Sequence, residues 1–165
     1  DPEYVDVWVG IGFCLEKREK YLEAIHYYQK ALKLDPENPD IHLALAVCEF
    51  KLGHRYNAYV HLEQALSLKP DDITIWQDWA QLLIDYENYT GAITYLEEGI
   101  KRNPSASELY YHIAAYCYEA GMVGKCLNYL ENALLIDYQN HYLLFHHAPD
   151  LQKNQEILEL IEQYA

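Results

Sequence analysis

The chain has 165 residues, of which 51% are hydrophobic and 23% charged, and its formal charge of −14 reflects 26 acidic against 12 basic side chains. This composition predicts a folded globular chain and excludes a disordered or low-complexity one. The negative charge repels phosphate backbones and anionic lipid surfaces, so we expect neither nucleic acid nor a membrane as partner. No apolar stretch approaches the roughly 20 residues of a membrane-spanning helix.

Prolines divide the chain at a fixed interval. Pro2, Pro36, Pro70 and Pro104 are each separated by 34 residues. Proline lacks an amide donor and pushes the preceding residue out of the helical region, so it ends a helix at a fixed place. We therefore expect each period to close at its proline and a new helix to begin shortly afterwards.

Within each period the apolar residues are three or four positions apart, and one polar turn interrupts them near the middle. This spacing predicts two amphipathic helices per period, that is, a helical hairpin. The predicted turns are 16–20, 53–54, 87–88 and 121–124. The residues expected to cap the next helices are Asp40, Asp71, Asp72, Asn103 and Ser105. Ser105 with Glu108 has the spacing of a capping box.

The four periods also agree column by column. Small residues recur where two helices must touch, in the columns Ala24, Ala58, Ala92, Cys126 and Ala31, Ala65, Gly99, Ala133. A large apolar column of the first helices reads Ile11, Leu45, Trp79 and Ile113. Two short helices cannot bury enough apolar surface alone to offset the entropy of ordering them, so each hairpin is expected to depend on its neighbours.

The first period carries a family resemblance. Its residues Trp8, Ile11, Gly12, Leu15, Ala24, Tyr28, Ala31 and Pro36 resemble the tetratricopeptide repeat pattern. Departures in later periods are His42, Glu49, Gly99, Cys126 and Tyr138. The resemblance implies an all-α, right-handed superhelical solenoid of about four hairpins with a C-terminal capping helix, in which the first helices line a concave surface.

On this basis we expect repeats at 5–38, 39–72, 73–106 and 107–139. Residues 140–165 are predicted to form a degenerate cap, with a short helix, Pro149 and a terminal helix from Asp150. Residues 1–4 match the phase of 35–38, which predicts the tail of a missing upstream repeat and a C-terminal fragment of a longer array. Apolar side chains left uncovered in the first hairpin would favour self-association. The tyrosine content and the ending EILELIEQYA are similar to arrays of gut Bacteroides-type bacteria.

The sequence offers no catalytic or metal-binding motif. It lacks Walker, G-x-S-x-G, H-E-x-x-H and dinucleotide glycine patterns, so we expect no enzyme and no cofactor. His146 and His147, with His141 nearby, are neighbours that point about 100° apart on a helix and do not form a chelating pair. The cysteines Cys14, Cys48, Cys117 and Cys126 lie far apart and form no C-x-x-C or zinc-ribbon spacing, so we expect buried reduced thiols. Reduced thiols favour a reducing, cytoplasmic compartment.

The resemblance implies a partner site on first-helix positions that the core does not use. These positions are Val9, Phe13, Leu43, Val47, Phe50, Gln77, Gln81, Ile84, Tyr111, His112 and Tyr118. Acidic residues at or beside them are Asp6, Asp40, Asp78, Asp85, Glu108 and Glu119. An apolar groove with an acidic edge predicts a protein or peptide partner with apolar anchors and basic flanks. The alternative is that some of these side chains pack against adjacent repeats or the terminal helix.

The family's carboxylate clamp for chaperone tails is absent, because the matching places hold Val9, Phe13, Ala44, Thr74 and Asp78. Binding of an acidic tail is therefore not expected. Two functions remain open from the sequence. One is a scaffold that binds a partner segment in its groove, and the other is a structural or self-associating arm of a larger protein, possibly joined to a catalytic domain outside this chain.

Overall fold

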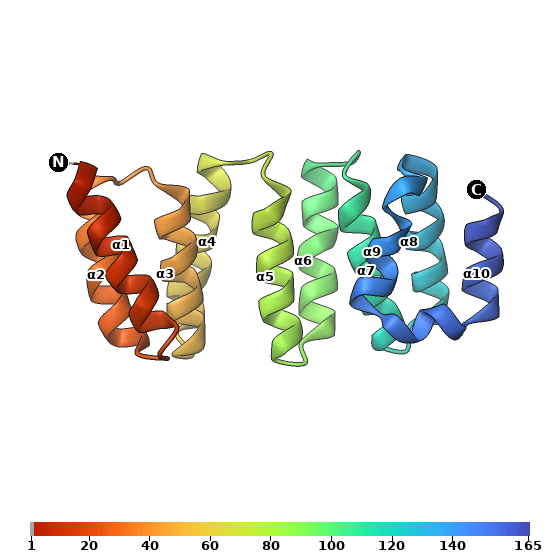
Figure 1. Cartoon of the computed structure of the whole chain (residues 1–165), viewed down its shortest axis with the longest axis horizontal. Helices are drawn as coiled ribbons and strands as arrows, with labels where there is room; N and C mark the ends of the chain where they lie inside the picture. The colour runs from red at the N-terminus through yellow and green to blue at the C-terminus, as the bar shows by residue number, and fades with distance from the viewer. Residues whose placement is uncertain (1) are drawn as a thin grey trace. The chain divides into compact units, whose positions relative to one another are not determined.

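The computed structural model describes residues 2–165, and within this range it contains helices and turns but no strand (Figure 1). The expected all-α class is confirmed. None of these helices is long and apolar enough to cross a membrane. The chain divides into two compact units, one ending at Asp72 and the other beginning at Ile73.

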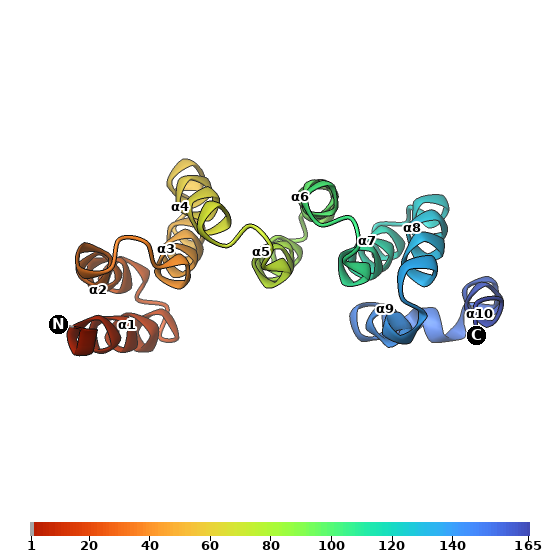
Figure 2. The same ribbon diagram turned by 90° about the horizontal axis from the view of Figure 1, so that it is seen from above.

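The first unit is two helical hairpins. Helices α1 (Pro2–Glu16) and α2 (Tyr21–Leu34) form one, and α3 (Pro39–Lys51) and α4 (Arg55–Leu68) form the other. Packing is extensive within each hairpin and between α2 and α3, and α1 also contacts α3. In the end-on view each hairpin appears as a pair of adjacent helices (Figure 2).

Turn chemistry explains where these helices begin and end. Asp35 leaves the helical region immediately before Pro36, as the proline spacing predicts. Asn38 caps α3 by accepting hydrogen bonds from the backbone amides of Asp40 and Ile41, and Pro39 occupies the first helical position. Gly53 has a φ of 82°, a conformation that glycine adopts without steric cost, in the turn before α4.

The core of the first unit lies where the small-residue columns bring helices together. Ala24, Tyr28 and Ala31 of α2 form one buried cluster with α3 side chains, including Ile41 and Leu45. The Tyr28 ring fills the space left by Gly12 of α1. A Cβ atom at Gly12 would lie 2.7 Å from Cε1 of Tyr28, so only glycine permits this approach.

The second unit begins with two further hairpins. They are formed by α5 (Ile73–Asp85) with α6 (Tyr89–Arg102) and by α7 (Ser107–Glu119) with α8 (Val123–Ile136). The α6 and α7 helices pack together, as α2 and α3 do in the first unit. Gly99 has the same role as Gly12, because a Cβ there would lie 3.0 Å from the Trp76 ring.

The remainder of the second unit is a series of short helices. These are the 3-10 helix η1 (Tyr138–His141), α9 (Tyr142–His147), the 3-10 helix η2 (Pro149–Lys153) and α10 (Gln155–Glu162). Helix α9 packs against α7, and α10 contacts α8 (Figure 2). The predicted terminal helix therefore begins at Gln155 rather than Asp150, because Asn154 accepts a hydrogen bond from the Ile157 amide and caps it there.

The predicted capping box is also wrong. Helix α7 begins at Ser107, and Ala106 occupies the N-cap position without a side-chain hydrogen bond. The backbone between the helices first makes a turn in which the Ala106 amide donates to the Asn103 carbonyl oxygen. This turn places Ser105 outside the first turn of the helix, so its hydroxyl does not cap α7.

Candidate partner-binding surface

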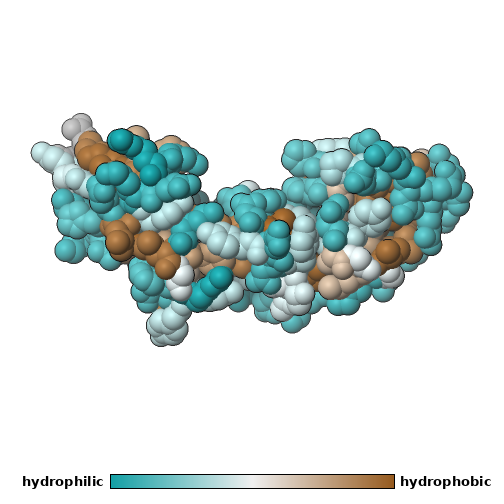
Figure 3. Space-filling view, turned by 90° about the horizontal axis from the view of Figure 1, so that it is seen from below, coloured by the Kyte–Doolittle hydropathy of each residue, from teal (hydrophilic) through white to brown (hydrophobic). Residues whose placement is uncertain are grey.

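Helices α1 and α3 of the first unit present a partly exposed apolar surface. It consists of Val9 and Phe13 from α1 and Leu43 and Val47 from α3, and we call these four residues the inner strip. Each pair is spaced i, i+4 and so shares one face of its helix. Phe13 is 51% exposed, and the other three side chains are partly buried. Apolar side chains also interrupt the hydrophilic surface of both units in the space-filling view (Figure 3).

Basic groups lie over several aromatic rings of the first unit, and two of these rings, Phe13 and Phe50, belong to the predicted groove. Lys17 Nζ is 5.0 Å from the centroid of the Phe13 ring, and the Arg55 guanidinium is 4.1 Å from that of Phe50. Such cation–π contacts stabilise by about 0.5–1 kcal/mol at exposed sites. Phe50 is only 2% exposed. The prediction that it lines the open groove is corrected, because this ring belongs to the core between the helices.

In the second unit, hydrogen bonds hold Gln81 and Asp85 of α5. Gln77 and Ile84 are partly buried, whereas Gln81 is exposed. The Gln81 amide nitrogen donates to Asp85 at 3.0 Å, and its carbonyl oxygen accepts from the Tyr116 hydroxyl at 3.2 Å. The structure therefore brings Gln81 and Asp85 together and fixes the orientation of both through α7.

The predicted residues of α7 are mostly covered by the C-terminal segment. Tyr111 is buried, and its hydroxyl donates to the Asp137 carbonyl oxygen at 2.9 Å. His112 is buried with its ring centroid 4.0 Å from that of His147 on α9. Both residues are removed from the open groove, because His112 packs against His147 of α9 and Tyr111 is bonded to the end of α8 at Asp137. Tyr118, about two turns further on, stays partly exposed.

Burial favours the uncharged form of these two adjacent imidazoles. It lowers the pKa of His112, whose Nδ1–H donates to the Glu108 carbonyl oxygen at 2.6 Å. Burial, and then the charges of His112 and His146, lowers the pKa of His147 to about 4. Both rings are therefore neutral near pH 7. Among residues 2–165, no three His, Cys, Asp or Glu side chains gather in a metal-binding arrangement.

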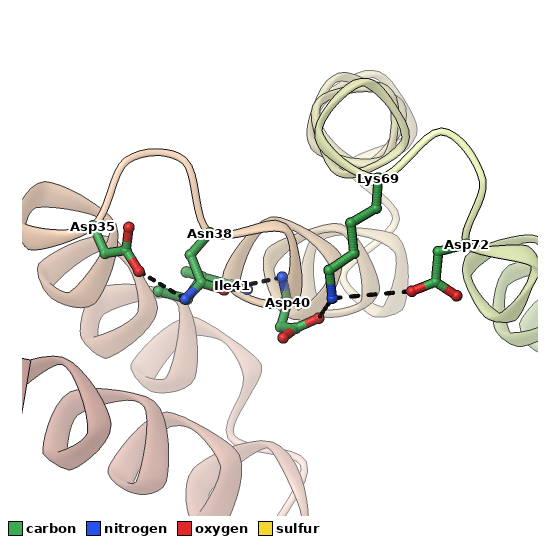
Figure 4. Close-up of polar contacts among 6 residues, drawn as sticks. All are labelled: Asp35, Asn38, Asp40, Ile41, Lys69 and Asp72. Atoms are coloured by element: carbon green, nitrogen blue, oxygen red, sulfur yellow. Dashed lines mark hydrogen bonds and ion pairs between the residues drawn. The ribbon is translucent and has the colours of Figure 1, made fainter.

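The acidic edge is largely exposed but partly neutralised. Asp6, Asp40, Asp78, Asp85 and Glu119 are exposed, and Glu108 is partly buried. Asp40 accepts a hydrogen bond from Lys69 Nζ at 3.3 Å, and the same ammonium lies 3.9 Å from Asp72 (Figure 4). The Asn38 side-chain amide donates to Asp35 at 2.8 Å beside it (Figure 4). Lys69 thus links the start of α3 to the end of the first unit and reduces the negative charge there.

The first unit also has a surface cavity that was not predicted. A surface cavity of about 610 Å³ is lined by Gln29, Leu32, Lys33, Pro36, His42, Val60, His61 and Gln64. The His42 and His61 Nδ1 atoms are 3.1 Å apart, and His42 Nε2 is 3.1 Å from the Pro36 carbonyl oxygen. Because a carbonyl oxygen only accepts, His42 Nε2–H is the donor to Pro36. The only signal in the sequence is His42, which stands in a column of aromatic residues.

Family models decide the classification. Three models described as tetratricopeptide repeat match residues 5–38, 27–57 and 78–125, which together span more than half of the chain. The chain belongs to the tetratricopeptide repeat family. Repeats of this family are generally non-catalytic scaffolds for protein interactions. A comparison with curated proteins gives no match.

Solved structures share the tetratricopeptide fold. PilF of Pseudomonas aeruginosa is 21% identical with a TM-score of 0.62, over 99% of this chain and 74% of PilF. The MamA protein is 19% identical with a TM-score of 0.56, over 99% of this chain and 93% of MamA. YrrB, titled a TPR protein with an unusual peptide-binding site, is 16% identical with a TM-score of 0.51, over 95% of this chain and 84% of YrrB. At these identities the similarity shows the fold alone.

Proposed function

We propose that this tetratricopeptide protein is a non-catalytic scaffold that holds a peptide or helix of another protein against its first helices. The observation that carries the proposal is the inner strip, where Phe13 remains half exposed beside three partly buried aliphatic side chains. A surface of this kind binds the apolar face of an amphipathic segment. YrrB, described as having a peptide-binding site, provides a precedent within the fold.

The partner proposed for this strip carries apolar anchors and basic flanks. Asp6 is exposed on α1, and the net charge of the chain is −14, so a cationic segment is attracted and an acidic one repelled. Lys17 lies over the Phe13 ring, and an aromatic anchor of the partner would compete with that ammonium for the ring face. The four free thiols suit a reducing compartment such as the cytoplasm.

The proposed site contains fewer residues than the sequence predicts. Tyr111 and His112 are excluded because α9 covers them, and Phe50 is excluded because it is buried. Gln77, Gln81, Ile84 and Tyr118 remain candidates on the second unit. Among the aromatic side chains of the predicted site, Phe13 of the inner strip has the largest exposed fraction, and we place the main anchor there.

Selection from a random phage-displayed peptide library provides the test. The selected peptides should share hydrophobic anchors and flanking Lys or Arg residues. Phe13→Ser combined with Val47→Ser should weaken binding of a selected, fluorescein-labelled peptide by about 10-fold or more, because the anchor contacts are lost. Leu22→Ser is the matched control, since Leu22 is 68% exposed on α2, outside the strip. Equal binding by the wild type and the strip variant would exclude the inner strip as the site.

A second role, as a self-associating arm, is supported by a different surface. Helix α1 leaves Tyr4 and Val7 exposed on the side that does not face α2. This role does not require a peptide in the inner strip, and the two can coexist in one molecule.

A further inference from the structure

The second hairpin differs from the other three in one pair of neighbouring rings. In every hairpin a ring of the first helix lies close to a ring of the second. The pairs, with the distances between ring centroids, are Trp8 with Tyr27 (5.7 Å), His42 with His61 (5.4 Å), Trp76 with Tyr95 (4.6 Å) and Tyr110 with Tyr129 (6.4 Å). Successive pairs are 34 residues apart. The second hairpin therefore has two small imidazoles where the others have tryptophan and tyrosine rings.

The cavity of about 610 Å³ lies at this pair, because both imidazoles belong to its lining. Its other lining residues come from α2, from α4 and from the loop between α2 and α3. Leu32, Pro36 and Val60 give it apolar surface. Cavities of roughly 300–1,000 Å³ with an apolar lining and a few polar groups are typical of small-molecule sites. The described lining residues include none of the inner strip, so this site is separate from the proposed peptide contact.

The charge of the lining favours an anion. Lys33 is exposed and forms no ion pair with another residue of 2–165, and none of the described lining residues is an aspartate or a glutamate. A cavity of about 410 Å³ at α8 and α10 of the second unit is different, because Glu131, Glu156 and Glu159 line it. In a chain with a formal charge of −14, the cavity of the first unit is therefore a local place where a carboxylate is attracted.

The hydrogen bonds of the two imidazoles leave one ring nitrogen for a ligand. Two N–H groups or two lone pairs would repel across the 3.1 Å between the Nδ1 atoms, so one proton lies between them. His42 Nε2–H donates to Pro36. His61 Nε2 makes no hydrogen bond to any residue that the structure describes. It is a lone pair in the uncharged pair, and it becomes an N–H donor when the pair takes up one more proton.

We propose that this cavity binds the carboxylate of a small aliphatic or aromatic acid, with Lys33 and the Nε2–H of His61 as polar contacts and Leu32, Pro36 and Val60 against the hydrocarbon part. The added proton leaves the hydrogen bond between His42 and His61 intact, because His61 then carries an N–H on both nitrogens. This inference goes beyond the scaffold role and does not depend on a peptide in the inner strip.

Binding should strengthen as the pH falls. Burial, and then the charge of His42, lowers the pKa of His61, whereas the charge of Glu49 raises it. Glu49 is itself paired with His54, whose Nδ1 lies 2.7 Å from Glu49 Oε2. Near pH 7 the free protein lacks the added proton, so a bound carboxylate must draw one from solution. We therefore expect about 10-fold tighter binding at pH 6.0 than at pH 7.5, where a small carboxylic acid is ionised at both values.

Isothermal titration calorimetry of the whole chain with hydrocinnamate, and with its uncharged amide, is the first experiment. The acid should bind at least about 10-fold more tightly than the amide at pH 6.0. Lys33→Gln should weaken binding of the acid by about 5-fold or more, and Lys125→Gln on α8 is the matched control. Equal affinities for acid and amide, no binding of the acid at millimolar concentration, or no effect of Lys33→Gln would overturn the proposal.

His61→Gln tests the role of the imidazole. This variant should bind the acid with the same affinity at pH 6.0 and pH 7.5, because glutamine does not titrate. His26→Gln, at an exposed histidine of α2, is the control and should keep the pH dependence of the wild type. A pH dependence that survives in His61→Gln would contradict the assignment of the proton to this pair.

Two further measurements separate this site from peptide binding. A tripeptide that ends in phenylalanine carries the same aromatic carboxylate at a chain terminus. Hydrocinnamate should bind more tightly than this tripeptide, and the opposite order would overturn the assignment to a small acid. Phe13→Ser should bind hydrocinnamate as the wild type does, so that loss of the inner strip and loss of this cavity are distinguished.

Discussion

Helices α1 and α7 are the first helices of their hairpins, yet their surroundings differ. Helix α7 packs against α6 and against α9, and Leu109, Tyr111 and His112 are buried as a result. Helix α1 leaves Val7 and Phe13 about half exposed. The comparison teaches that repeat columns specify which side chains can be buried, whereas the adjacent helices determine which of them are.

This comparison also assigns different roles to the two units. In the second unit, the C-terminal segment packs on α7, where the sequence predicts part of the partner site. In the first unit, the equivalent inner strip stays partly exposed. The proposed peptide contact therefore falls on the first unit.

The largest expected effect compares two residues of the same column. Ile41→Ala should lower the free energy of unfolding by about 2–4 kcal/mol, because Ile41 is fully buried and the change leaves a cavity. Val7→Ala should lower it by less than about 0.5 kcal/mol in dilute protein, because Val7 is half exposed. Urea unfolding followed by circular dichroism measures both. Similar losses for the two variants would contradict the assigned difference in packing.

Two glycines of α1 provide the next comparison. Gly12→Ala should destabilise the protein by about 1–3 kcal/mol, because the new methyl group would overlap the buried Tyr28 ring. Gly10→Ala should instead stabilise it by about 0.5–1 kcal/mol, because alanine loses less entropy in a helix and the site is open. Thermal unfolding of the dilute variants gives both signs. An increase in stability with Gly12→Ala would exclude the Tyr28 contact.

Acidification should weaken the contact between α9 and α7. The pKa of His147 falls from 6.5 to about 4 on burial beside His112, His146 and Tyr116, so between these values the unfolded chain binds the proton and the folded chain does not. The stability contribution is complete above pH 6.5 and decreases as pH falls toward 4. Because the side chain is partly exposed, we expect a loss of about 1–2 kcal/mol.

His147→Gln is the variant that isolates this effect. It should reduce the pH dependence of unfolding between pH 7 and 4, measured by urea denaturation at each pH, because glutamine does not titrate. His141→Gln is the control, since His141 lies on η1 and its ring contacts Tyr138 rather than His112. If the free energy of unfolding depends on pH in His147→Gln as it does in the wild type, His147 is not the source of that dependence.

The smallest effect is expected at the ion pair in Figure 4. Lys69→Met removes the ammonium that lies 3.3 Å from Asp40 and 3.9 Å from Asp72. Asp40 is 80% exposed, so solvent screens the pair and the loss should be below about 0.5 kcal/mol. Urea unfolding at low and at high salt provides the measurement, because urea, unlike guanidinium chloride, is not itself a salt. A loss above 1 kcal/mol that persists at high salt would show that this link is stronger than an exposed ion pair.

Most of the fold can be predicted from the spacing of the sequence. Leu45, Trp79 and Ile113, which share one column, are all buried. The turns predicted at 53–54 and 87–88 lie between the observed helices, whereas those predicted at 16–20 and 121–124 overlap the end of α1 and the start of α8. These features are predictable because helical periodicity and proline placement act locally. The start of α7 was mispredicted, because Ser105 has a capping pattern but the backbone turn from Asn103 to Ala106 determines the first residue of the helix.

The candidate surface is less predictable. Phe13 can be identified from its place outside the core columns, and it is exposed. Tyr111 and His112 have the same kind of place but are buried, because residues 142–147 form a helix that packs on α7. Nothing in the 34-residue pattern describes that segment, since it follows the last regular period. Likewise, Cys14 was expected to be buried but is exposed, because its column lacks the cover that Cys48 receives.

Hydrogen exchange measured by mass spectrometry tests most directly whether neighbouring helices determine the stability of each repeat. In dilute protein, the amides of α1 should exchange faster than those of α3, because α3 packs against both α2 and α4 whereas Val7 and Cys14 of α1 are exposed. Equal protection of α1 and α3 in dilute protein would contradict the account.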